Sequence, residues 1–430
     1  VGFKRVQVLY FLTLSGQWAN MPQGTDYWWL EKKMSGILCP LFSMRRKHDF
    51  GVGDLECLGK FIEYLALKDF DMVFLLPTAQ TTPEDPSPYS GMSIFANNAI
   101  LHLPIDSLNS DVTNPTRRKI FPEYPERIDY SSVFTINEKI LWQIFHHEIY
   151  PQILEGKGGF DDYVEENKYW IGNYALFHTL RDHFKAKAWW QWPDEYKNRN
   201  PQVLEKFTSE YKKEITFYQW LQWMYFQRWQ KVRQSARQRG KRIIGDLPIY
   251  PAANSSEVWA LRDLFDTEKS AGVRPDWNCK EGHSFGSHPY RWRDNYEKVL
   301  EFWFERIRYS AKFFDGARID HLPGFIGEWL IEKGKKAADG AFYPANEDER
   351  VSLGRKILTS LAKAALEEGI VLIGEDLGEC TSEVRKMLDE LSEQLPNLFL
   401  YNVVGWREKG MANKLHTLVV EAIHDTPSTF

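Results

Sequence analysis

Three short segments in the second half of the chain each place an acidic residue at the end of a predicted strand. The predicted strands cover residues 314–320, 371–375 and 418–424, and the acidic residues are Asp320, Glu375 and Asp425. In a barrel of parallel strands, the groups that perform chemistry lie at the carboxyl ends of the strands. We therefore expect the three carboxyl groups to meet at one mouth, where such a set suits cleavage of a glycosidic bond.

Arg318 lies two residues before Asp320, so both side chains would face the same side of a strand. A neighbouring guanidinium favours the carboxylate form, which a nucleophile needs, and we expect it to keep Asp320 ionised. An isolated Arg-x-Asp is more often a local ion pair at a strand end. The spacing alone therefore leaves both interpretations open.

Glu375 closes an apolar stretch, residues 370–373 followed by a glycine. Desolvation there should raise the pKa of its carboxyl group, as a general acid requires, although a buried and hydrogen-bonded structural Glu fits equally well. His424 and Asp425 form a pair that could bind the hydroxyls of one sugar ring and stabilise positive charge at its anomeric carbon. Each signal is weak alone, and three in succession are strong.

The surrounding pattern predicts an α/β protein with a TIM (β/α)8-type barrel. Seven strands are expected, at residues 37–42, 72–76, 242–246, 314–320, 371–375, 398–404 and 418–424. Helical periodicity follows several of them, for example at 55–66 and 358–368. We expect residues 1–35 to be an N-terminal extension or linker and residues 36–430 to be the catalytic barrel. A large, mainly helical subdomain, residues 77–240, would be inserted between strands 2 and 3.

Aromatic residues are abundant, at 15% of the chain. Aromatic faces can pack on pyranose rings, but a large core explains the abundance equally well. We assign to the core of the insertion the aromatic residues at helical spacing, namely Trp170, Tyr174, Phe177, Trp220, Trp223 and Trp229. The less periodic Trp189, Trp190 and Trp192 could form either a surface platform or a buried hinge.

The overall composition excludes several classes of protein. The net charge is −5, from 54 basic and 59 acidic residues, which favours neither nucleic acid nor an anionic membrane as a partner. No apolar run approaches the ~18 residues of a membrane helix, and we see no signal peptide. The four scattered cysteines indicate reduced thiols and a cytoplasmic location.

These acidic residues, together with several upstream blocks, resemble the 4-alpha-glucanotransferases (amylomaltases or disproportionating enzymes) of glycoside hydrolase family 77. The blocks are residues 87–98, 169–177, 245–250, 256–260, 274–277 and 289–292, and they occur in the family's order. The resemblance implies a retaining transfer of α-1,4-glucan segments from a glucan donor to glucose or a maltooligosaccharide. It implies no metal and no organic cofactor, and the chain shows no ligand spacing for either.

The resemblance also implies a role for each matching residue. Asp320 would be the nucleophile, Glu375 the acid/base and Asp425 the transition-state stabiliser. The implied substrate-binding residues are Tyr89, Ser93, Asp246, Trp277, Arg318 and His424. Among these, Arg318 would orient Asp320, Tyr89 would stack on the donor sugar, and Trp277 lies in a loop that would cover bound glucan.

Departures from the family pattern leave two alternatives open. The family usually has Gln, Trp and Asn where this chain has His283, Phe285 and Ser287, and an acidic residue where it has Asn254. The chain also stops at Phe430, before the family's eighth strand, so we expect a barrel with two unpaired edges. A retaining α-glucan hydrolase and a non-catalytic glucan-binding protein are therefore the alternatives, although binding alone needs no acid and nucleophile.

Overall fold

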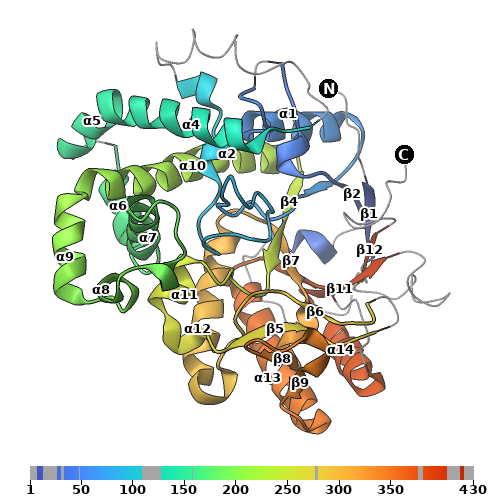
Figure 1. The fold of residues 1–430 in the computed structure, drawn as a ribbon. Coiled ribbons are helices and arrows are strands. Elements are labelled where there is room, and N and C mark those ends of the chain that lie inside the picture. Colours follow the sequence, from blue (N-terminus) through green and yellow to red (C-terminus); the bar gives the residue numbers. More distant parts are fainter. Residues whose placement is uncertain are drawn as a thin grey trace.

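The computed structural model describes residues 7–12, 27–30, 33–47, 49–108, 127–156, 158–276, 279–375, 381–403 and 417–420. Seven parallel strands form most of a barrel (Figure 1). They are β2 (Met34–Leu38), β3 (Met72–Phe74), β4 (Arg242–Pro248), β7 (Gly316–Asp320), β10 (Val371–Gly374), β11 (Leu398–Val403) and β12 (Thr417–Val420). All seven expected strands are confirmed, with boundaries that shift by a few residues.

The eighth position of the barrel is filled by β1 (Gln7–Leu12), which pairs antiparallel with both β2 and β12. No eighth parallel strand occurs in the described residues, but the two unpaired edges that we expected are not present there either. Exposed edge N–H and C=O groups favour any strand that can reach them, and the apolar, aromatic sequence of β1 suits a strand. The segment that we took for an irregular extension therefore contributes to barrel closure.

Strand side chains alternate between the barrel interior and the surrounding helices. On β10, Val371 and Ile373 belong to the interior cluster, whereas Leu372 packs in the outer cluster. Across the interior, the rings of Phe74 and Tyr401 are 6.4 Å apart although their strands are not neighbours. This period of two is the reason that a polar residue such as Arg318 can point inward from β7.

Helices cover the barrel from outside (Figure 1). Those that accompany the strands are α1 (Leu55–Leu67), α11 (Ser256–Ala260), α12 (Trp292–Ala311), α13 (Glu347–Glu367) and α14 (Ser382–Gln394). A small second sheet has the order β6-β5-β8-β9. Its strands are β5 (Lys269–Val273), β6 (His283–Ser284), β8 (Glu328–Glu332) and β9 (Ala341–Tyr343), and none of them was expected from the sequence.

The described residues between β3 and β4 form helices. They are α2 (Ala99–His102), α4 (Tyr130–Ile144), α5 (Tyr150–Leu154), α6 (Phe160–Glu166), α7 (Ile171–His183), α8 (Asp194–Lys197), α9 (Pro201–Glu210) and α10 (Lys212–Gln238). Of the aromatic residues assigned to the core here, all are buried except Trp223, which is half-buried. That these helices form a separate subdomain stays a prediction.

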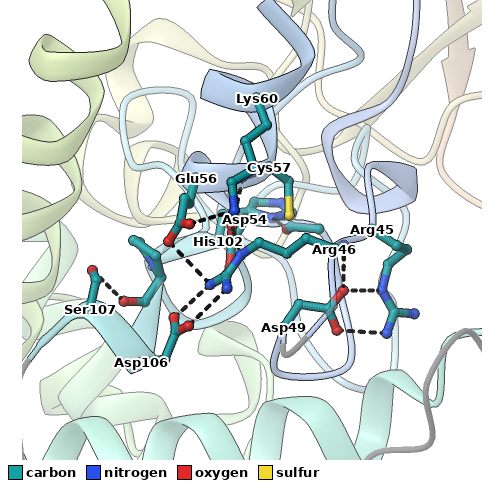
Figure 2. A network of polar contacts seen from close by, with 12 residues as sticks. Arg45, Arg46, Asp49, Asp54, Glu56, Cys57, Lys60, His102, Asp106 and Ser107 are labelled. Carbon is teal, nitrogen blue, oxygen red and sulfur yellow. Dashed lines mark hydrogen bonds and ion pairs between the residues drawn. The ribbon is translucent and has the colours of Figure 1, made fainter. Parts of the chain in front are cut away.

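The loop that follows β2 is held by a network of ion pairs around Arg46 (Figure 2). Its guanidinium contacts Asp54 at 2.8 Å and Asp106 at 2.5 Å. Asp54 is also the N-cap of α1, where it accepts a hydrogen bond from the Cys57 N–H. One buried cation thus joins the loop, the start of α1 and the short 3-10 helix Ile105–Leu108.

Replacing Arg46 with alanine should lower the free energy of unfolding by about 3–5 kcal/mol, because buried Asp54 would lose its cation. The measurement is urea unfolding. Lys60→Ala is the matched control, since Lys60 pairs with Glu56 in the same network but is exposed. It should cost about 0.5 kcal/mol or less. Equal losses for the two variants would show that the network is not stabilising in this way.

Candidate active site

Arg318 lies at the centre of the candidate site, on the interior face of β7, and is buried. Its Nη1 donates to both carboxylate oxygens of Asp246, at 2.8 and 2.7 Å. Its Nη2 contacts Asp320 Oδ1 at 2.7 Å and Glu375 Oε2 at 3.2 Å. One guanidinium therefore holds three carboxyl groups from three neighbouring barrel strands.

Strand register explains how these groups meet. Asp246 on β4 and Ile373 on β10 are both paired with Arg318 on β7. Asp320 is the last residue of β7, and Glu375 follows β10 directly, with its N–H donating to the Ile319 carbonyl at 3.1 Å. Glycine at 374 leaves room for the Leu322 side chain, because a Cβ there would lie 2.5 Å from it.

Asp320 and Glu375 contact the same nitrogen of Arg318, so the sum of those two distances is the upper limit on the separation of their bound oxygens. That limit is of the order of the ~5.5 Å between the two carboxyl groups of a retaining glycosidase. Both groups are reachable from solvent, since 29% of the Asp320 side chain and 15% of the Glu375 side chain are exposed. The two carboxyl groups therefore lie close together and both can be reached from solvent, as a double displacement requires.

His321 directs its backbone toward Glu375. Its φ of 55° and ψ of 54° are left-handed, which is uncommon for a residue with a side chain. In this conformation its N–H donates to Glu375 Oε2 at 2.7 Å. Such local strain is characteristic of functional sites, and here it orients one of the two carboxyl groups. The left-handed residue directly after Asp320 was not apparent in the sequence.

The pKa of Asp320 is shifted in the direction opposite to the one that we expected. Burial raises the pKa of Asp320 and the Glu375 carboxylate raises it further, whereas Arg318 lowers it, and the net direction is upward. Asp246 follows the same pattern, with burial raising its pKa more than Arg318 lowers it. Arg318 thus acts on Asp320 in the expected direction, but burial outweighs it, because one cation is shared among three carboxyl groups.

Tyr89 and Asp246 form the wall behind the carboxyl groups. The Tyr89 hydroxyl donates to Asp246 Oδ2 at 2.8 Å, and Asp246 is buried with Arg318 and Tyr89 as its partners. Ser93 is also fully buried, and its hydroxyl donates to Glu257 at 2.6 Å. In this arrangement Asp246 and Ser93 support their neighbours, so direct substrate contact by either stays a prediction.

Three of the sequence-predicted site residues, Trp277, His424 and Asp425, lie outside the described residues. Their proximity to Asp320 and Glu375 therefore stays a prediction. Among the residues that the structure does describe, no group of three or more His, Cys, Asp or Glu side chains is arranged to hold a metal ion. The described helices likewise include none that is long and apolar enough to cross a membrane.

A cleft of about 650 Å³ opens beside Asp320. Tyr89, Asp320 and His321 line it, together with all four positions that depart from the family pattern, namely Asn254, His283, Phe285 and Ser287. The ring of Phe285 contacts those of His321, at 5.1 Å, and Tyr250, at 6.3 Å. The departures thus lie in the part of the protein where a substrate bound to Asp320 would extend.

The same cleft decides the question that the sequence left open about three tryptophans. Trp189 and Trp192 are buried, whereas Trp190 is 47% exposed and lines the cleft. Spacing could not separate these residues, because they lie in and directly after a short 3-10 turn, Trp189–Gln191, and not in a periodic helix.

Tyr250 connects the cleft to the small sheet. Its hydroxyl donates to Glu328 on β8 at 3.1 Å, and the same oxygen of Glu328 accepts the Tyr290 N–H at 3.1 Å. Glu328 is buried, and this burial raises its pKa to about 8. The carboxyl group that supports this wall of the cleft is therefore neutral at pH 7. The sequence did not single it out as functional.

Two carboxyl groups at adjoining strand ends of a barrel are the arrangement used by retaining enzymes that act on glycosidic bonds. The family model described as 4-alpha-glucanotransferase, of glycoside hydrolase family 77, matches residues 39–429. The chain belongs to this family, as its motifs predicted.

Curated relatives and solved structures agree with the family. The 4-alpha-glucanotransferase of Aquifex aeolicus is 31% identical over 362 residues, which are 82% of this chain and 70% of that protein. That of Synechocystis is 31% identical over 374 residues, 84% of this chain and 72% of that protein. The amylomaltase of Streptococcus agalactiae in complex with acarbose has a TM-score of 0.73 at 26% identity, covering 86% of this chain and 72% of that chain.

The raised pKa of Glu328 predicts a pH-dependent contribution to stability. The unfolded chain ionises this group near its ordinary value of 4.5, whereas the folded chain holds the proton up to about pH 8. Its contribution is therefore complete below about pH 4.5 and is lost as the pH rises to about 8. We expect the free energy of unfolding of the natural chain to fall between those two pH values relative to that of Glu328→Gln.

The measurement is urea unfolding at several pH values. Glu332→Gln is the matched control, because Glu332 lies on the same strand but is 65% exposed. The free energy of unfolding of this control variant should change with pH in parallel with that of the natural chain. If Glu328→Gln also did so, the buried carboxyl group would not carry the pH dependence.

Proposed function

We propose that this protein transfers α-1,4-glucan segments between maltooligosaccharides or starch-like glucans by a retaining double displacement. The observation that carries the proposal is that Asp320 and Glu375 share one nitrogen of Arg318 while both remain accessible. Buried structural carboxylates would not need such access. The names of the relatives in the family support glucan transfer as the outcome.

In the first step Glu375 protonates the glycosidic oxygen as that oxygen leaves, and Asp320 attacks the anomeric carbon. The C–O bond to the leaving sugar breaks, and a covalent bond between the donor glucan and Asp320 forms. In the second step Glu375 takes the proton of an incoming 4-hydroxyl, and that oxygen displaces Asp320. Two inversions at the same carbon retain its configuration.

Arg318 serves both steps. Its bond to Asp320 lowers the pKa of that carboxyl group and directs the oxygen, which offsets part of the effect of burial. Its contact with Glu375 is longer, at 3.2 Å. Asp425 completes the proposal as the group that stabilises positive charge at the anomeric carbon.

The remaining sequence-predicted residues take supporting parts. Tyr89 stacks on the donor sugar while its hydroxyl is held by Asp246. Trp277 and His424 contact bound glucan. Ser93, which is buried, supports its neighbours through its hydrogen bond to Glu257. The acceptor is glucose or a maltooligosaccharide. The cytoplasmic location is part of the proposal and agrees with free thiols at Cys39, Cys57 and Cys279.

The experiment that tests the function is product analysis after incubation with maltotriose. Transfer should give a ladder of oligosaccharides longer than maltotriose, whereas hydrolysis would give only glucose and maltose. Asp320→Asn should reduce product formation by at least about a thousandfold while maltotriose still binds, because it removes the nucleophile and preserves the shape. A near-normal ladder from this variant would overturn the assignment of Asp320.

Glu375→Gln separates the two halves of the acid/base role. A donor with a good leaving group needs no proton, so its first step should proceed at close to the natural rate. The second step should stay slow, and the covalent glycosyl-enzyme should accumulate. Intact-mass spectrometry after rapid quenching measures this species. If the activated donor failed to restore the first step, Glu375 would not be the acid.

A further inference from the structure

We infer that Trp190 forms a glucose-binding subsite in the catalytic cleft, away from the carboxyl groups, which makes the protein bind long maltooligosaccharides more tightly than short ones. The inference rests on the proposed function, because the same cleft would hold the glucan that reacts at Asp320. Trp190 and Phe285 are both exposed aromatic side chains, and both line this cleft. An exposed indole face is suited to packing on the C–H face of a pyranose ring.

The two neighbouring tryptophans hold Trp190 in place. The Trp189 indole N–H donates to the Ala253 carbonyl at 2.9 Å, and the Trp192 indole N–H donates to the Lys187 carbonyl at 2.9 Å. The Trp189 ring contacts that of Trp190 at 5.6 Å in an edge-to-face arrangement. With both flanking rings buried, the turn leaves Trp190 as the ring that projects from it. A ring fixed in this way loses little entropy on binding.

The support behind Trp189 involves two residues on the segment that follows β4. Asn254 Oδ1 accepts a hydrogen bond from the backbone N–H of Trp189 at 3.2 Å, and the Arg262 guanidinium stacks on the Trp189 ring at 4.6 Å. Asn254 is one of the departures from the family pattern and also lines the cleft. One of the residues that support Trp190 through Trp189 therefore departs from the family pattern.

Trp190 and Asp320 line the same cleft from different segments of its wall. Pro248, which pairs with Asp320, and Asn254, which contacts the turn that carries Trp190, lie at opposite ends of the cleft-lining segment 248–254. The cleft is also lined by Arg181 and Glu84, which form an ion pair at 3.1 Å and offer polar atoms to sugar hydroxyls. A short oligosaccharide at Asp320 would thus leave Trp190 unoccupied.

The test is calorimetric binding of maltotriose and maltoheptaose to Asp320→Asn, in which turnover does not disturb the equilibrium. Adding Trp190→Ala should weaken maltoheptaose binding by about five- to tenfold and change maltotriose binding by less than about twofold. Trp190→Phe should retain most of the affinity, since it keeps an aromatic face. Tyr64→Ala is the matched control, because Tyr64 is 40% exposed on α1 and does not line the cleft.

Two results would overturn the inference. One is an unchanged affinity of Trp190→Ala for maltoheptaose, and the other is an equal loss for both sugars, which would place Trp190 near the reacting groups or reflect a disturbed fold. Failure of the proposed function is separate, because it would appear as the absence of a product ladder from the natural chain. If Trp190 made binding depend on chain length but the natural chain produced no ladder, the subsite inference would stand and the proposal of glucan transfer would be overturned.

Discussion

The site depends on one buried cation that is shared among three carboxyl groups. Removing three carboxylates from water at the end of a barrel is unfavourable unless positive charge accompanies them. Arg318 supplies that charge and fixes their geometry, with a bidentate contact to Asp246 and single contacts to Asp320 and Glu375. Although burial favours a neutral guanidine, the three carboxyl groups raise the pKa of Arg318 well above its ordinary range.

The shared cation also makes the two reacting groups unequal. Both carboxylate oxygens of Asp246 accept from Nη1 of Arg318, whereas Asp320 and Glu375 share its Nη2. The shorter contact goes to Asp320, which must carry negative charge to attack. Glu375 has the longer contact and an additional hydrogen bond from the His321 backbone, which holds it in position. The proposed double displacement gives the two groups different roles, a nucleophile that attacks as an anion and an acid/base that exchanges a proton.

The barrel and its surroundings supply the rest. Parallel pairing of β4, β7 and β10 places Asp246 level with Arg318, with Asp320 and Glu375 just beyond at the strand ends. The strand β1 pairs with the two strands that would otherwise be edges. The walls of the cleft come from elsewhere: the turn with Trp190, the segment with Asn254, and Tyr250 held by Glu328 of the small sheet. Chemistry and substrate selection are thus carried by different parts of the chain.

Local patterns in the sequence were sufficient for the seven parallel strands, for Arg318 and Asp320 on one face of β7, and for Glu375 at the end of β10. Each follows from the period of a strand or from the position of a residue at its end, which neighbouring residues determine. The motifs were also sufficient for the family. None of these inferences required knowing which distant segments touch.

Only the tertiary structure decided the features that depend on such contacts. Three such features are the pairing of β1 with β2 and β12, the burial of Ser93, and the exposure of Trp190 between two buried tryptophans. Each depends on contacts between segments that are far apart in the chain. The pKa of Asp320 is another case, because the sequence named Arg318, Asp246 and Glu375 as site residues but did not show that three carboxyl groups share one buried cation. Burial and charge are sums over everything nearby in space, and a sequence shows only what is nearby along the chain.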